Sequence, residues 1–172
     1  MGATTALRRT LKARFFRFLV AKGFVADLRN QPTSTVFRRR LGSRVQIVGV
    51  QWEKYGKPRF AVHFGTCPAE GLQLQDGVRS PDDILPTWCP DTGSLQPGRG
   101  LSSRAWFRQD STVMQRLRGQ PALRSPDHVV EELLALFPQL ERYWTVGEVG
   151  PHVRLWRFSG RRRSQGAPDS WA

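Results

Sequence analysis

The chain of 172 residues has few of the residue types on which metal and thiol chemistry depends: 2 cysteines and 3 histidines. Cys67 and Cys89 do not form a CxxC pair, and His63, His128 and His152 lie far apart without an HxH or HExxH spacing. A zinc site needs three or four converging ligands. We therefore expect no metal site and no cofactor, but two structural thiols and a packed or partly exposed histidine.

Signatures of catalysis are equally sparse. The glycine pair at Gly98 and Gly100 lacks the following lysine and helix of a phosphate-binding loop. Asp82 and Asp83 are adjacent, so their side chains do not face each other as acid–base partners do. A nucleophile made of Cys67 and its near neighbour His63 has no third group to orient it. These absences argue against an enzyme.

No apolar run approaches the roughly 20 residues that cross a bilayer, and no secretory apolar region is recognisable. We expect no membrane contact, a cytoplasmic location and reduced thiols. The first 24 residues are basic and free of acids, as in a mitochondrial transit peptide. Their apolar stripe favours a core helix instead, because its members recur at helical spacing: Leu7, Leu11, Phe15 and Phe18.

Charge is what the sequence has in excess: 27 Lys+Arg against 14 Asp+Glu, a net charge of +13. Residues 1–60 hold 14 basic and 2 acidic residues, whereas residues 67–101 hold 2 basic and 5 acidic residues. Only 4 of the basic residues are lysine, a bias that genome base composition alone can produce. The charge therefore indicates either an anionic partner of the N-terminal third or a background without function.

Apolar periodicity predicts an α+β fold, with an antiparallel sheet of four or five strands packed against two main helices. The helices are expected at about 4–22, ended by Gly23 with Phe24 folding back, and at about 126–145, begun by Ser125 and kinked or broken at Pro138. The strands are expected at 35–40, 44–55, 59–67, 102–109 and 151–158, with a short helix at 110–118.

The segments between and after these elements complete a single domain over residues 1–158. Residues 68–101 carry recurrent Gly and Pro without apolar periodicity, which predicts one long irregular loop. Residues 159–172 lack an apolar pattern, which predicts a disordered basic tail.

Two groups of polar residues are candidates for a site. The first group consists of candidate polyanion ligands that flank the turns between strands: Arg38, Arg39, Arg40, Arg44 and Arg59. Aromatic residues lie beside them in the sequence: Trp52, Tyr55 and Phe60. These aromatic rings stack on bases if they are exposed, and they fill the core if they are buried. The second group interrupts otherwise apolar strands and forms either structural hydrogen bonds, which we favour for the glutamines, or a pocket: Gln46, Gln51 and His63.

One series of motifs is shared with known proteins. It runs from Gly23-Phe24 through Phe37-Arg38-Arg39, the strand Val45–Gln51 and the strand Arg59–Gly65 to Trp106-Phe107. In this order the motifs resemble a widespread bacterial family of small proteins classified only as a domain of unknown function. The resemblance covers residues 5–66 well and 101–146 loosely. It implies an α+β fold and no established activity.

We therefore expect a non-catalytic binding or accessory protein of the bacterial cytoplasm that acts through protein–protein contacts. The alternative is binding of nucleic acid or another polyanion through the Arg-rich N-terminal third, and a small enzyme with an unrecognised pocket comes third. An exposed apolar groove beside the acidic loop would favour a protein partner. A continuous Arg face without acids would favour a polyanion.

Overall fold

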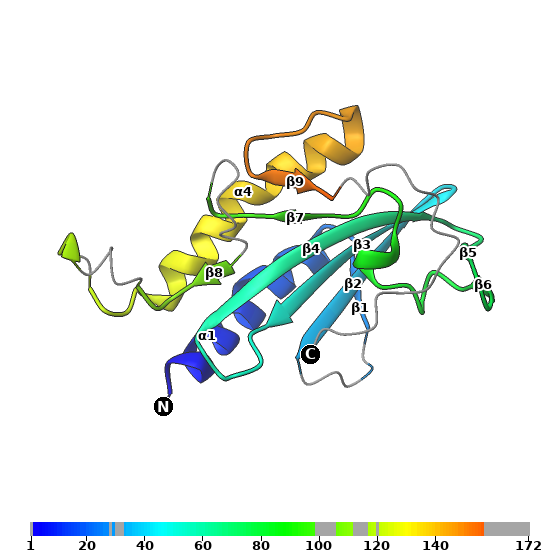
Figure 1. The fold of residues 1–172 in the computed structure, drawn as a ribbon. Coiled ribbons are helices and arrows are strands. Elements are labelled where there is room, and N and C mark those ends of the chain that lie inside the picture. Colours follow the sequence, from blue (N-terminus) through cyan, green and yellow to red (C-terminus); the bar gives the residue numbers. More distant parts are fainter. Residues whose placement is uncertain are drawn as a thin grey trace.

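A computed structural model describes residues 2–27, 29, 33–98, 106–111, 117–119 and 121–156. It has an antiparallel sheet with helices on one of its faces (Figure 1). The strands follow the order β1-β2-β3-β4-β7-β9, and β8 pairs with the start of β4. The expected α+β class is confirmed. The sheet has more strands than expected because several short segments pair at its edges.

The strand bounds show which residues form the centre of the sheet. The long central strands are β2 (Ser34–Leu41), β3 (Arg44–Trp52) and β4 (Arg59–Pro68). The short strands are β1 (Val25–Ala26), β7 (Gly93–Leu95), β8 (Trp106–Arg108) and β9 (Val153–Leu155). Periodicity identifies the long strands well, because three residues carry too little alternation to be recognised alone.

The first helical segment comprises α1 (Ala3–Leu11), a π-helical turn η1 (Lys12–Phe16) and α2 (Arg17–Ala21). Leu7, Leu11 and Phe15 of its apolar stripe are fully buried and Phe18 is half-buried, as expected for a core helix. Gly23 adopts a φ of 84°, and the N–H of Phe24 donates to the carbonyl of Leu19 at 3.0 Å. This geometry ends the helix and turns Phe24 into the core, which confirms both expectations.

The second main helix, α4 (Pro126–Val146), begins as predicted. The hydroxyl of Ser125 accepts a hydrogen bond from the N–H of Asp127 at 3.3 Å, and Pro126 occupies the first turn. The helix continues through Pro138, so the possible break there is not observed. It ends at Gly147, whose φ of 74° is left-handed.

Two apolar clusters lie on opposite faces of the sheet. The larger joins the helices to one face through side chains that include Leu11, Phe37, Phe64 and Phe137. The smaller lies on the opposite face, where residues 81–92 and the short helix η2 (Pro86–Trp88) cover part of the sheet around Ile47.

The segment expected as one irregular loop thus contains regular structure. Besides η2 and β7 it forms a hairpin of β5 (Leu72–Leu74) and β6 (Gly77–Arg79). Two glycines let η2 approach the sheet, because a Cβ on Gly49 would lie 2.9 Å from Pro86 Cγ and one on Gly65 2.6 Å from Cys89 Cβ. The expected tail at 159–172 and most of the expected helix at 110–118 lie outside the described residues.

Candidate functional site

Arg38, one of the expected polyanion ligands, is buried and fixes the segment that covers the sheet. Its Nε donates to the carbonyl of Pro81 at 2.8 Å and its terminal nitrogens to the carbonyl of Ile84 at 3.0 Å and to Asp27 at 2.9 Å. These bonds occupy the guanidinium within the protein.

Arg39 points to the other face of the sheet. It donates to Gln46 Oε1 at 3.0 and 2.7 Å and to the carbonyl of Lys22 at 2.9 Å. Its guanidinium lies 4.4 Å from the ring centre of Phe24. The buried amide of Gln46 thus ties Arg39 to the sheet beside the end of α2.

The other three expected ligands are more accessible but lie apart. Arg40 pairs with Asp82 at 3.1 Å, and exposed Arg44 has no ion pair among the residues that the structure describes. Arg59 pairs with Glu53 at 3.3 Å at the opposite end of the sheet. The five arginines therefore do not form one continuous face free of acids.

The acids of residues 68–101 explain part of the basic excess of residues 1–60. Asp82 and Asp83 pair with Arg40 and Arg29, and the Pro81 and Ile84 carbonyls accept from Arg38. The two segments of opposite charge bind each other within the molecule.

His63 and Gln51 meet on the sheet face that bears η2. His63 Nε2 lies 3.0 Å from Gln51 Oε1, so the neutral ring donates from Nε2, and Trp156 approaches its edge with ring centres 5.2 Å apart. Burial lowers the pKa of His63 to about 4. Its Nδ1 is buried, and none of the described residues forms a hydrogen bond with it. The pair is a neutral polar contact at neutral pH.

Cys67 and Cys89 are free and buried, and burial raises the pKa of both thiols. Within the described ranges, no three His, Cys, Asp or Glu side chains converge as a metal site would require. None of the helices in the described part of the chain combines the length and apolarity needed to cross a membrane.

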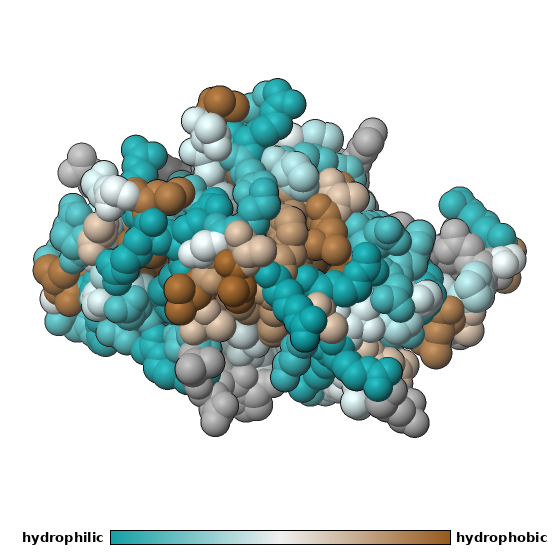
Figure 2. Space-filling model, turned by 180° about the vertical axis from the view of Figure 1, so that it is seen from behind, coloured by the Kyte–Doolittle hydropathy of each residue, from teal (hydrophilic) through white to brown (hydrophobic). Residues whose placement is uncertain are grey.

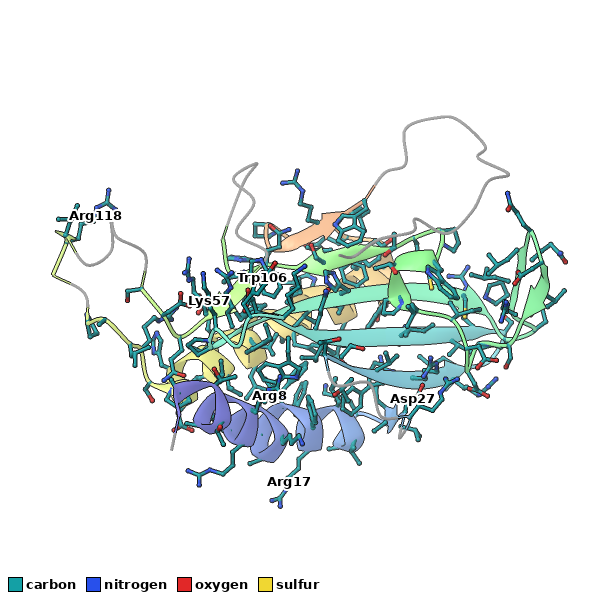
Figure 3. The ribbon with its side chains drawn as sticks, turned by 60° about the horizontal axis from the view of Figure 1, so that its bottom comes forward. Arg8, Arg17, Asp27, Lys57, Trp106 and Arg118 are labelled. Carbon is teal, nitrogen blue, oxygen red and sulfur yellow. The ribbon has the colours of Figure 1, made fainter. Side chains whose placement is uncertain are left out.

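The charged side chains on the outer face of the first helical segment are all cations. Arg9, Lys12 and Arg17 are exposed, and no acid occurs before Asp27. Figure 3 shows Arg17 pointing away from the sheet. None of the three forms an ion pair with another described residue.

The turn between β3 and β4 adds two exposed lysines, Lys54 and Lys57. Its Gly56 carbonyl accepts a hydrogen bond from the Thr4 hydroxyl at 2.5 Å, which joins the turn to the start of α1. We call Arg9, Lys12, Arg17, Lys54 and Lys57 the cationic band. The sequence signal for its helical part was the absence of acids over the first 26 residues, rather than the number of arginines.

The only acid of the turn is Glu53, which is buried. Its carboxylate is bound by N–H groups of the turn and by Arg59. Its Oε2 accepts from the N–H groups of Tyr55 at 2.8 Å and Lys57 at 3.0 Å, and its Oε1 lies 3.3 Å from Arg59. Burial opposes ionisation, but the bonds from Lys57, Arg59 and Tyr55 hold the pKa of Glu53 below its usual value. Glu53 therefore fixes the turn as a carboxylate, and no described residue forms an ion pair with Lys54 or Lys57.

The expected aromatic residues separate into two classes. Trp52 and Phe60 are buried in the core, whereas Tyr55 is 76% exposed at the turn. Trp106 of β8 is half-buried and lies opposite Ala61 of β4. The guanidinium of Arg59 lies 5.4 Å from the ring centre of Trp106. No motif in the sequence assigns Trp106 a functional role.

The helical face also exposes apolar side chains. Figure 2 shows an apolar patch over the helices on the side opposite η2. Among the apolar residues of the helices, Val20 is 59% exposed, and Phe18 and Leu134 are half-buried. This patch lies on the helices, away from the hairpin β5-β6 (Figure 1, Figure 2).

Comparison of the chain with family models, with curated proteins and with solved structures found no match.

Proposed function

We propose that this protein binds nucleic acid through the cationic band. The observation that carries the proposal is the band itself: Arg9, Lys12, Arg17, Lys54 and Lys57 are exposed and have no ion pair within the described residues. The expected arginines at 38–40 contribute little to this surface because Arg38 and Arg39 are engaged inside the protein.

Physical chemistry supports a polyanion at this surface. Cations that already hold a carboxylate lose that contact when a phosphate displaces it, whereas unpaired cations gain one and release the counterions of the nucleic acid. Most acids in the described ranges are held by arginine or lysine, so little negative charge opposes a phosphate backbone.

The test is fluorescence anisotropy with labelled RNA and DNA at several salt concentrations. A band variant carries Arg9→Gln, Lys12→Gln and Arg17→Gln. A matched control removes the same charge from exposed arginines that have acidic partners, with Arg40→Gln, Arg79→Gln and Arg142→Gln.

We expect the band variant to bind at least about tenfold more weakly than the unmodified protein. The slope of the logarithm of the binding constant against the logarithm of the salt concentration, here called the salt slope, should become about two to three units less steep. The control should bind like the unmodified protein. Equal loss in both variants would show that net charge alone causes the binding.

A protein partner is the second candidate. The apolar patch over the helices (Figure 2) and the exposed Val20 of α2 favour it. Exposed apolar area on a helical face is typical of protein interfaces. Val20→Glu should abolish capture of such a partner and leave nucleic-acid binding unchanged.

We also propose a cytoplasmic location, because of the two cysteines. Two free cysteines suit a reducing cytoplasm. Membership of the uncharacterised bacterial family stays a proposal based on the order of the motifs in residues 5–66.

A further inference from the structure

Tyr55 is held rigidly in an exposed position. Glu53 accepts the N–H groups on either side of the turn, from Tyr55 and Lys57, and Gly56 adopts a φ of 75°. The Gly56 carbonyl is bound in turn by Thr4 of α1. These contacts fix the backbone, yet the Tyr55 side chain is 76% exposed. The core gains nothing from this aromatic ring.

A cation lies against the ring of Tyr55, and a second follows in the same turn. Lys54 Nζ lies 5.0 Å from its ring centre, and Lys57 follows two residues later. An exposed aromatic ring flanked by cations is the arrangement that binds an unpaired base together with its phosphates.

A second aromatic residue lies at the same end of the sheet. The pairing of β8 with β4 places Trp106 opposite Ala61 and beside Arg59, and the carbonyl of Pro58 accepts from Gln109 at 2.9 Å. Figure 3 shows Lys57 and Trp106 near each other there. The small side chain of Ala61 leaves Trp106 without a large cross-strand neighbour on β4.

From these contacts we infer that the ligand is single-stranded nucleic acid and that its bases stack on Tyr55 and Trp106. The inference rests on the proposed function and names the form of the polyanion. Bases in a duplex already have both faces stacked, so the aromatic rings contribute only to an unpaired strand. The lysines of the turn hold the phosphates next to those bases, and the helical part of the cationic band extends the path of the backbone.

The experiment compares a labelled 12-nucleotide single strand of mixed sequence with the duplex of the same sequence, for RNA and for DNA. The variants are Tyr55→Ala, Tyr55→Phe and Lys57→Gln. Val78→Ala is the control because Val78 is 65% exposed on the distant β6. Tyr55 and Val78 are both exposed, so neither truncation removes core packing.

We expect the single strand to bind at least about tenfold more tightly than the duplex. Tyr55→Ala should weaken single-strand binding by about 5-fold or more, as loss of one stacked base does, with an unchanged salt slope. Tyr55→Phe and Val78→Ala should bind normally, and Lys57→Gln should lower the salt slope by about one unit or less. Trp106→Phe should still bind the single strand, whereas Trp106→Leu should bind it more weakly. The midpoint of thermal unfolding of both variants shows whether they are folded.

Three results would count against these ideas in different ways. Equal affinity for duplex and single strand, or no effect of Tyr55→Ala, overturns the stacking inference while the cationic band still binds. Failure to bind either form near physiological salt overturns the proposed function as well. If Tyr55→Ala and Val78→Ala weaken single-strand binding equally, the loss does not come from a base stacked on Tyr55. That result also overturns the inference.

Discussion

The Nε of Arg38 lies 2.8 Å from the carbonyl oxygen of Pro81, although 43 positions separate the two residues in the chain. This bond joins the basic N-terminal third of the sequence to residues 67–101, which hold five acidic residues. Arg38 also holds the Ile84 carbonyl and Asp27, so one buried guanidinium fixes the cover over the second apolar cluster. The charge asymmetry of the sequence therefore has a structural role.

Arg38→Met should destabilise the fold by about 3 kcal/mol, because it leaves two carbonyls and a carboxylate without their charged donor. The measurement is the urea midpoint. Arg40→Met is the control, since the pair of Arg40 with Asp82 is more than half exposed and contributes at most about 1 kcal/mol. Equal midpoints for the two variants would contradict the role of Arg38.

Gly65→Ala should destabilise the protein by about 2 kcal/mol or more. The new methyl carbon would lie 2.6 Å from both the Pro86 carbonyl oxygen and Cys89 Cβ, and backbone atoms there cannot move without displacing η2. Gly2→Ala is the control because a Cβ there has nothing within 4 Å. Denaturant unfolding measures both, and a neutral Gly65→Ala would show that η2 is loosely held.

The fold could be predicted where apolar periodicity was long. The helix stripe from Leu7 to Leu19 and the alternation in Val45–Trp52 each repeat often enough to define a buried face. Strand β7 could not be predicted, because Gly93-Ser94-Leu95 is too short to show a period and its pairing with β4 is decided by tertiary contacts.

The candidate site was harder to predict because sequence shows charges and not their partners. Arg38 and Arg9 are alike in the sequence, but one is buried against Pro81 and the other is exposed without an ion pair in the described ranges. The acids that distinguish them lie far along the chain. Tyr55 and Trp52 likewise lie close together in the sequence. Trp52 ends β3 and is buried in the core, whereas Tyr55 lies in the turn that Glu53 fixes and is exposed.

His63 should make stability depend on pH in the weakly acid range. Its pKa is about 4 in the folded protein against an ordinary 6.5, because burial disfavours the charged ring. The unfolded chain therefore binds more protons between these values, and stability falls as the pH drops through that window. From pH 8 to pH 5 the loss attributable to His63 should be about 2 kcal/mol.

His63→Gln isolates this effect from the other titrating groups. The difference in unfolding free energy between the variant and the unmodified protein should shrink or reverse in favour of the variant as the pH falls from 8 to 5. A difference that is constant over this range would show that His63 has an ordinary pKa in the folded state.

Cys67 and Cys89 should react with a thiol reagent only when the protein opens. Both side chains are 1% exposed, and burial raises the pKa of each thiol, so the reactive thiolate is scarce and inaccessible at neutral pH. With Ellman's reagent we expect slow labelling in buffer and immediate labelling of both thiols in denaturant. Arg38→Met should speed labelling of Cys89, because it loosens the segment that leads into η2, whereas Arg40→Met should not. Rapid labelling of the unmodified protein would show that the cover over Gly65 opens readily, and it would also weaken the stability predictions for Gly65 and Arg38.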